Sequence, residues 1–293
     1  MTALLAFVRL GRPLFLGGGF ILYAIGAAVA AATGHAIDWH RYALGQLCVT
    51  AFQLMTHYAN DYFDLDADRA NATPTAWSGG SRVLPDGELS PRVALVAALV
   101  LAAIGGVVSV LLASALPFVI GALAWSYSAP PLRLCARGLG ELTTALVVTV
   151  LVPLLGFHLQ AADARGAGLL GLSIVPLALL QFASLLAIEF PDAAGDAATG
   201  KRTLVVQLGA RASALLYIVV VVVAYAWPLV AWMLGLPART VVLTLAPAPI
   251  AVWRIVRIRD HADPAAFEKL TFWAVALLVA TSACVLASWL VLR

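Results

Sequence analysis

Long apolar segments are the feature that most limits how this chain can fold. Nine of them occur, and most, such as residues 93–113, are near the roughly 20 residues with which a helix crosses a bilayer. The lipid interior offers the backbone no hydrogen-bond partners, so a chain that crosses it repeatedly must satisfy its amides internally. The sequence therefore predicts an all-α, polytopic membrane protein with about nine transmembrane helices in a bundle.

Composition supports the same class of protein. Hydrophobic residues make up 62% of the 293 residues and charged residues 11%, whereas a soluble domain carries about 25% charged residues. The formal net charge of +3 gives no indication of nucleic-acid binding. The three cysteines, Cys48, Cys135 and Cys284, are far apart in sequence and show no metal-binding spacing, so we expect reduced, buried thiols.

The apolar segments define the expected helices. We expect spans at residues 14–32, 42–59, 93–113, 116–127, 139–160, 169–188, 212–234, 240–256 and 270–292. The first is long for a signal-peptide core and is followed by further spans, so we interpret it as a retained helix. Pro117 opens the short fourth span, which predicts a tight hairpin with the third. Pro247 and Pro249 lie inside the eighth and predict a kink or local unwinding there.

The distribution of charge predicts how the helices are oriented. If the N-terminus is cytoplasmic, 14 of the 18 basic residues fall on the cytoplasmic side and four on the other, as the positive-inside rule requires. Thirteen of the 15 acidic residues fall on the cytoplasmic side too, and nine of these lie in only two loops, residues 60–92 and 189–211. Ordinary loops have no reason to concentrate carboxylates in this way, so we expect the functional site at the cytoplasmic end of the bundle.

The first acidic motif, NDYFDLDAD, directly follows the second span. In a continuing helix Asn60, Asp64 and Asp68 are four residues apart and lie on one face, with Asp61 beside them. Carboxylates that share a face repel one another unless cations lie between them, and Mg²⁺ prefers such oxygen ligands. The alternatives are a solvated acidic loop or an N-terminal cap for the next helix, but the helical spacing favours a magnesium site.

The second acidic motif, EFPDAAGD, follows the sixth span. Asp192 and Asp196 stand one helical turn apart, and Lys201 and Arg202 come soon after them. A diphosphate that bridges metal ions at both motifs, with the basic side chains on its oxygens, fits this arrangement.

The order of helix, acidic turn and basic segment occurs twice, which predicts an internal duplication. We expect a single transmembrane domain over residues 1–293. Its two related four-helix halves are predicted at residues 14–127 and 139–256, and one further helix completes the chain.

Three segments resemble the UbiA superfamily of intramembrane prenyltransferases: NDYFDLDAD with the downstream SGGSRVLPDGELSP, WSYSAPPLRL, and EFPDAAGDAATGKRTLVVQLG. The match spans most of the chain in the correct order. The segments are most similar to the menaquinone-type branch, whose members prenylate 1,4-dihydroxy-2-naphthoate, and less similar to the 4-hydroxybenzoate branch. The resemblance implies an enzyme of the inner membrane of a bacterial or archaeal cell that uses Mg²⁺, a prenyl diphosphate and an aromatic acceptor.

The resemblance also assigns roles to individual residues. It implies a metal site formed by Asn60, Asp61, Asp64, Asp68, Asp192 and Asp196. Asp64, Asp68, Asp192 and Asp196 are then the expected catalytic residues, and Asn60, Arg82, Tyr127, Arg133, Lys201 and Arg202 the expected substrate contacts. The basic residues could instead contact lipid headgroups, and Tyr127 could be an interfacial aromatic side chain. Asp66 lies off the common helical face, so we expect it in solvent.

These groups predict a reaction. Metal and basic side chains neutralise charge on the departing diphosphate, and a dry apolar chamber protects the resulting carbocation until an aromatic acceptor attacks it. Two alternatives stay open: a UbiA-type terpene cyclase, in which a double bond of the substrate captures the cation, and a cation transporter that uses the acids as its ion site. Transporters usually place such groups near mid-membrane, whereas these lie at one end of the spans.

Overall fold

Helices form the regular structure of residues 2–291, the part of the chain that the computed structural model describes. They are α1 (Ala3–Leu10), α2 (Pro13–Ala32), α3 (Trp39–Phe63), α4 (Leu65–Ala70), α5 (Pro91–Leu111), α6 (Leu116–Ser128), α7 (Gly140–Leu146), α8 (Val152–His158), α9 (Ala167–Ala198), α10 (Leu204–Leu208), α11 (Ala210–Met233), α12 (Ala238–Leu245), α13 (Ala248–Arg257) and α14 (Phe267–Leu290). Short 3₁₀ turns cover Leu134–Arg137, Ile258–Ala262 and Pro264–Ala266, and a π-helical turn, Val147–Leu151, joins α7 to α8. The predicted all-α class is confirmed.

Each predicted span corresponds to a helical segment, with residue 292 of the last span outside the described residues, but these segments differ in how well they suit a membrane. Within residues 2–291, seven are long and apolar enough to cross a bilayer. The other two predicted spans correspond to α3, whose 25 residues include several polar side chains, and α6, which is apolar but has only 13 residues. The fold is that of a polytopic membrane protein, while the count of nine spans and the cytoplasmic position of the motifs stay predictions.

Prolines lie at two positions where the sequence predicts a helix to begin or to be interrupted, whereas two further prolines do not interrupt α9. Pro117 lies in the first turn of α6, where its missing N–H group is not needed, and α6 packs against α5 as the predicted hairpin. The eighth span is interrupted between α12 and α13, as predicted: Pro247 precedes α13 and Pro249 lies in its first turn. In contrast, α9 stays helical for 32 residues despite Pro176 and Pro191. The second acidic motif is therefore the last part of this helix and not a turn after it.

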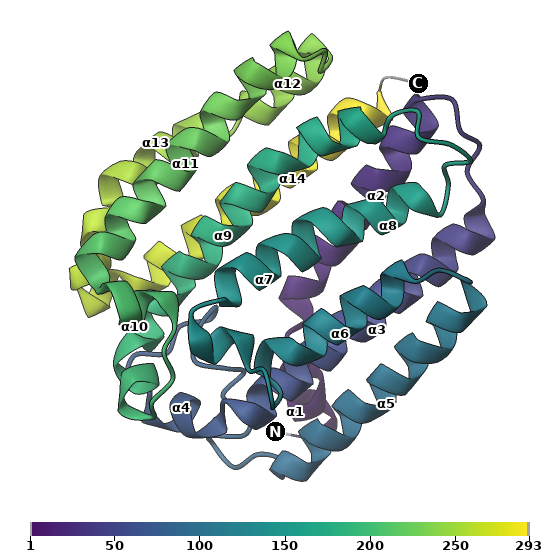
Figure 1. The fold of residues 1–293 in the computed structure, drawn as a ribbon. Coiled ribbons are helices and arrows are strands. Elements are labelled where there is room, and N and C mark those ends of the chain that lie inside the picture. Colours follow the sequence, from purple (N-terminus) through teal and green to yellow (C-terminus); the bar gives the residue numbers. More distant parts are fainter. Residues whose placement is uncertain (1, 292–293) are drawn as a thin grey trace.

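The long helices lie roughly along one direction, with α9 and α14 side by side in the middle of the bundle (Figure 1). Helices α11, α12 and α13 cover one flank, and α3, α5 and α6 the other (Figure 1). Two hydrophobic cores hold the flanks together: α9 contributes Leu177 to one and Leu186 to the other, and α14 contributes Val285 and Leu277 in the same way. The proposed duplication of residues 14–127 and 139–256 stays a prediction.

The short helices α1, α4 and α10 gather at one end of the bundle, opposite the end that holds α12 (Figure 1). Helix α3 leads into α4 at this end, and the last turns of α9 pack against α4. The fold thus places both acidic motifs at the same end, although they belong to helices far apart in the sequence.

Candidate active site

The first acidic motif bends where the sequence suggested one continuous helix. Helix α3 ends just before Asp64, and α4 begins just after it. The amide of Asp64 still donates to the carbonyl of Asn60, and the amide of Asp68 to that of Asp64, each at 2.9 Å. The predicted four-residue spacing therefore survives the bend. Asn60 Nδ2 donates to Asp64 Oδ2 at 2.7 Å, and the side chains of Asp61, Asp64 and Asp68 are buried.

Lys201 joins the two motifs. Its Nζ lies 2.9 Å from Asp64 Oδ2 in the first motif and 3.3 Å from Asp196 Oδ1 in the second. Burial lowers the pKa of Lys201, but the attraction of Asp64 and other neighbouring acidic groups outweighs it, so the pKa is raised well above its usual value. The side chain is therefore a fixed positive charge between carboxylates that are more than 100 residues apart in sequence.

Arg12 is a site residue that the sequence patterns did not single out. It lies just before α2, with its backbone in the left-handed region at φ 48°. Its guanidinium forms an ion pair with Asp61 and donates to Asn60 Oδ1 at 3.1 Å. The second oxygen of Asp61 accepts hydrogen bonds from the backbone amide, at 3.1 Å, and the hydroxyl of Ser81. Both oxygens of Asp61 are thus engaged within the protein.

A loop between α4 and α5 contacts both motifs, and we call residues 71–82 the clamp loop. It reaches Asp192 through Asn71, whose Nδ2 donates to Oδ1 at 2.7 Å, and through the amide of Gly79, which donates to Oδ2 at 3.2 Å. Gly80 has φ +72°, and a Cβ there would lie 2.2 Å from Asp68 Oδ2. The two glycines of the SGGS segment therefore allow the backbone to approach the carboxylates closely.

The remaining predicted basic residues differ in their distance from the motifs. Arg133 Nη2 lies 3.9 Å from Asp64 Oδ1, and Arg82 donates to the backbone carbonyl of Asp68. Arg202 is exposed, and none of its described contacts reaches the aspartates. The side chain of Asp66 is 90% exposed, as expected for a residue off the common helical face.

Among the aspartates of the two motifs, three buried carboxylate oxygens have no hydrogen-bond partner: Asp64 Oδ1, Asp68 Oδ2 and Asp196 Oδ2. Burial raises the pKa of Asp68 to about 8, and other carboxylates of the site add to the rise. Within residues 2–291 no three acidic, His or Cys side chains converge closely enough to enclose a metal ion by themselves. This arrangement suits Mg²⁺, which takes one or two carboxylates and fills its shell with water and phosphate oxygens.

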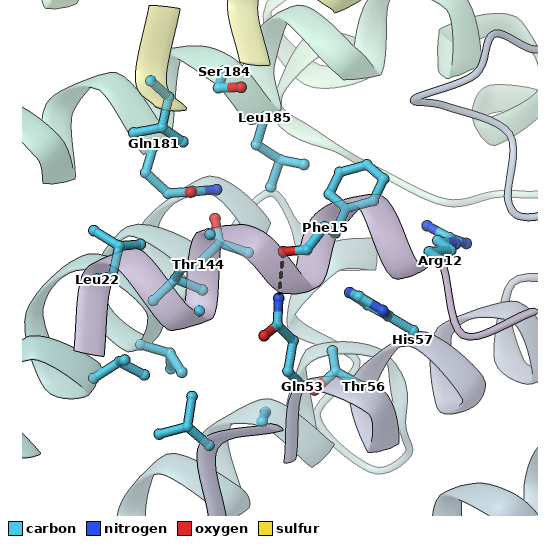
Figure 2. Close-up of a pocket in the computed structure, with 18 of the residues that line it drawn as sticks. Arg12, Phe15, Leu22, Gln53, Thr56, His57, Thr144, Gln181, Ser184 and Leu185 are labelled. Atoms are coloured by element: carbon cyan, nitrogen blue, oxygen red, sulfur yellow. Dashed lines mark hydrogen bonds between the residues drawn. The ribbon is translucent and has the colours of Figure 1, made fainter. Parts of the chain in front are cut away.

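A cavity of about 250 Å³ extends from the first motif between α2, α3, α6, α7, α9 and α14. Arg12 and His57 lie near one end of it and Leu22 lies farther along α2 (Figure 2). Asn60 and Tyr127, both predicted as substrate contacts, line the cavity. Most of its wall is apolar, and besides Arg12, Asn60 and Tyr127 the polar side chains on it are Gln53, Thr56, His57, Thr143, Thr144, Gln181, Ser184 and Ser282. The site thus combines a charged end with a mainly apolar chamber.

Comparison with known proteins agrees with this geometry. The model of the UbiA prenyltransferase family matches residues 20–276, which is most of the chain. The chain belongs to the UbiA prenyltransferase family. This membership makes the protein a prenyltransferase and confirms the superfamily resemblance of the acidic motifs.

Individual relatives of this UbiA family member include one from an archaeon. Digeranylgeranylglyceryl phosphate synthase of Halobacterium salinarum is 30% identical over 285 residues, which cover 90% of each chain. The UbiA homolog of Archaeoglobus fulgidus, solved bound to GPP and Mg²⁺, is 15% identical with a TM-score of 0.66, covering 96% of this chain and 99% of its own. The apo UbiA homolog of Aeropyrum pernix K1 is 18% identical with a TM-score of 0.68, covering 92% and 97%. At these identities the two structures show a shared fold.

Proposed function

We propose that this enzyme transfers an isoprenyl group from a prenyl diphosphate to an acceptor, with Mg²⁺ held at the two acidic motifs. The observation that carries the proposal is the position of Lys201 between Asp64 and Asp196, because Asp64 also bonds Asn60, which lines the apolar cavity. A prenyl diphosphate has the matching shape, because a highly charged head is joined to a long apolar chain. The Archaeoglobus fulgidus homolog bound to GPP and Mg²⁺ supports this choice of ligands.

The carboxylates divide between two roles in this proposal. Asp64, Asp68 and Asp196 have oxygens without donors and would hold the metal, with Asn60 and Asp192 beside them. Asp61, whose oxygens are engaged by Arg12 and Ser81, instead holds that arginine in place. When bound, Mg²⁺ supplies neutralising charge to the departing diphosphate.

Basic side chains contribute the fixed part of the positive charge. Lys201 stays protonated, so its ammonium is a preorganised donor where negative charge develops as the allylic C–O bond breaks. Arg133 lies beside Asp64, as Lys201 does, and would reach the same diphosphate oxygens as Lys201. Arg82 approaches from the clamp loop beside Asp68. Arg202 is assigned no contact, because its described contacts lie away from the motifs.

The cavity provides the second requirement, which is exclusion of water. Phe15, Leu22 and Phe52 are among the apolar residues of its wall. A carbocation formed beside them meets few water molecules, so it survives until the acceptor attacks. Tyr127 lines the cavity near its charged end and is placed to contact the allylic part of the substrate.

Two acceptors are supported by different observations. The Halobacterium salinarum relative is named for digeranylgeranylglyceryl phosphate, which supports an acceptor of the glyceryl phosphate class. The three sequence segments that resemble the superfamily are most similar to the menaquinone-type branch, which supports 1,4-dihydroxy-2-naphthoate. We favour the glyceryl phosphate, because that match extends over 90% of the chain whereas the branch resemblance rests on short segments.

One experiment separates these possibilities. Purified protein is incubated with Mg²⁺ and geranylgeranyl diphosphate in three parallel reactions. One contains geranylgeranylglyceryl phosphate as acceptor, one contains 1,4-dihydroxy-2-naphthoate, and one contains no acceptor. The products are identified by mass spectrometry. We expect the doubly prenylated glyceryl phosphate. A prenylated naphthoate would move the acceptor to the quinone class, and a cyclised hydrocarbon without acceptor would indicate a terpene cyclase. Absence of any product and of released diphosphate would contradict the proposed reaction.

A further inference from the structure

A second cavity, of about 290 Å³, lies between the end of α13 and the start of α14. It lies near the end of the bundle that holds the acidic motifs, because the ring of His261 packs 5.1 Å from that of Phe190, an apolar residue of the second motif. The beginning of α14 also accepts a hydrogen bond from the clamp loop, from the amide of Ala76 to Glu268 at 3.0 Å. No residue of the acidic motifs lines this second cavity.

Arg254 is the most unusual residue of the second cavity, because it is a charged side chain that is only 1% exposed. Its Nε donates to the hydroxyl of Tyr217 at 3.3 Å, and its guanidinium lies 5.2 Å from the centre of that ring. Its Nη2 has no hydrogen-bond partner, and no carboxylate in the described chain forms an ion pair with it. A buried charge without a counter-charge is costly, so an anion in the cavity would be bound favourably.

Two further basic side chains and two acidic ones line the cavity. Arg257 lies 3.6 Å from Asp260, at the surface. Asp263 accepts the backbone amide of Ala265 at 2.9 Å and so caps the short turn before α14. Lys269 is exposed and, within residues 2–291, forms no ion pair. The cavity therefore offers more positive charge than its own carboxylates neutralise.

The surroundings of the second cavity resemble the boundary between a membrane and water. Trp253 lines the cavity and packs edge-to-face on Trp273, with ring centres 5.4 Å apart. Tryptophan is enriched at the headgroup level of membranes. The neighbouring surface is apolar, with Val252, Val256 and Phe272 exposed by 62%, 65% and 45%. A molecule with its anionic group in the cavity can lay hydrocarbon chains along this surface.

We propose that the second cavity binds the phosphate group of an anionic phospholipid. Arg254, Arg257 and Lys269 donate to the phosphate oxygens, and the acyl chains lie along the apolar face of α13. A phospholipid and free phosphate both present a phosphoryl group to these basic side chains. The exposed apolar surface and the tryptophan pair beside the cavity favour the lipid. This site is independent of prenyl transfer, since no residue of the acidic motifs contributes to it.

The test uses the full-length protein in detergent, titrated with phosphatidylglycerol or phosphatidylcholine and followed by native mass spectrometry. The Arg257→Gln/Lys269→Gln double variant is expected to bind phosphatidylglycerol about tenfold more weakly than the wild type, since each substitution removes a charge-assisted contact with the phosphate. Binding of phosphatidylcholine is expected to change little. The matched control is Arg92→Gln/Arg211→Gln, which removes the same charge from exposed positions outside the cavity and should bind like the wild type.

Three results would overturn the proposal. One is unchanged phosphatidylglycerol binding in the double variant, and another is an equal loss in the control, which would indicate unspecific attraction of charge. The third comes from a parallel thermal-shift titration with inorganic phosphate. If phosphate alone gives a shift that depends on Arg257 and Lys269 while the lipid gives none, the cavity is a phosphate site and not a lipid site. Arg254→Gln, if it folds, should weaken lipid binding in the same way.

Discussion

The two acidic motifs meet at one end of the bundle, but they hold their buried carboxylates in different ways. In the first motif Asp61 is paired with a charged group, the guanidinium of Arg12. In the second motif Asp192 accepts hydrogen bonds from two neutral amides, those of Asn71 and Gly79. Loss of the acid therefore leaves a mostly buried guanidinium without its counter-charge in the first motif, but only unsatisfied neutral donors in the second.

The comparison also separates carboxylates within each motif. Asp61 and Asp192 use both oxygens to hold other parts of the protein, including the clamp loop. Asp64, Asp68 and Asp196 each keep a buried oxygen without a donor. Residues that look alike in the sequence pattern thus divide into those that hold the site together and those that are available to a metal.

The largest expected effect comes from the available carboxylates. Asp64→Asn and Asp196→Asn should each reduce kcat by about 100-fold or more, because the Mg²⁺ that would neutralise the departing diphosphate loses a carboxylate that holds it. Initial rates of diphosphate release measure the effect. Asp66→Asn is the matched control within the first motif, since that side chain is 90% exposed, and it should keep near wild-type activity. Equal activity of all three variants would contradict the division of roles.

The next effect tests the difference between the two holding aspartates. Asp61→Asn should lower the free energy of unfolding by about 3 kcal/mol, because the mostly buried guanidinium of Arg12 loses its counter-charge. Asp192→Asn should cost about 1 kcal/mol, since its partners are neutral donors. Thermal unfolding of the detergent-solubilised variants gives the comparison. Equal losses of stability would show that the charge of Arg12 is compensated in another way.

A smaller effect is expected where the clamp loop meets Asp68. Gly80→Ala places a Cβ 2.2 Å from Asp68 Oδ2, so the carboxylate must move, and we expect about tenfold lower kcat from its misplacement. Gly87→Ala is the control, because Gly87 has nearly the same φ, +71°, but no atom within 4 Å of the added Cβ. The two variants share the backbone strain and differ in the contact. A similar loss in both would assign the effect to strain.

The smallest effect concerns the anchor of the clamp loop on the second motif. Asn71→Ala removes one neutral hydrogen bond to Asp192, worth about 1 kcal/mol, which corresponds to roughly a fivefold change. We expect this change in the KM for the prenyl diphosphate, with a folded protein of nearly unchanged melting temperature. An unchanged KM together with a large loss of stability would indicate that Asn71 supports the fold and not the site.

The helices and the acidic positions could be predicted from local patterns. An apolar run of membrane-spanning length favours a helix from the local sequence alone. The four-residue spacing of Asn60, Asp64 and Asp68 survived even the bend at Asp64. The end of α9 was placed too early, because polar residues from Glu189 onward resemble a loop. That end packs within the protein, where Gly195 lies close against the backbone of Ala67 and so supports continued helix.

The contacts across the site could not be predicted, because they depend on how distant segments pack. Arg12 and Asp61 are 49 residues apart, and Asn71 and Asp192 are 121 apart. Nothing near Arg12 in the sequence distinguishes it from a basic residue that faces lipid headgroups. The SGGS segment that contains Gly80 is part of the superfamily resemblance, but the sequence does not show why a glycine is needed there. The cause is the nearby Asp68 carboxylate, which is visible only in the structure.

The most direct test asks whether the two motifs form one diphosphate site. Binding of a non-reactive prenyl diphosphate analogue is measured with Mg²⁺ for the wild type, Asp64→Asn, Asp196→Asn and the double variant. If both carboxylates act on one metal-bound diphosphate, the double variant should bind about as weakly as either single variant, which is a strong non-additivity. If the losses of the single variants multiply in the double variant, the motifs act independently and the shared site is contradicted.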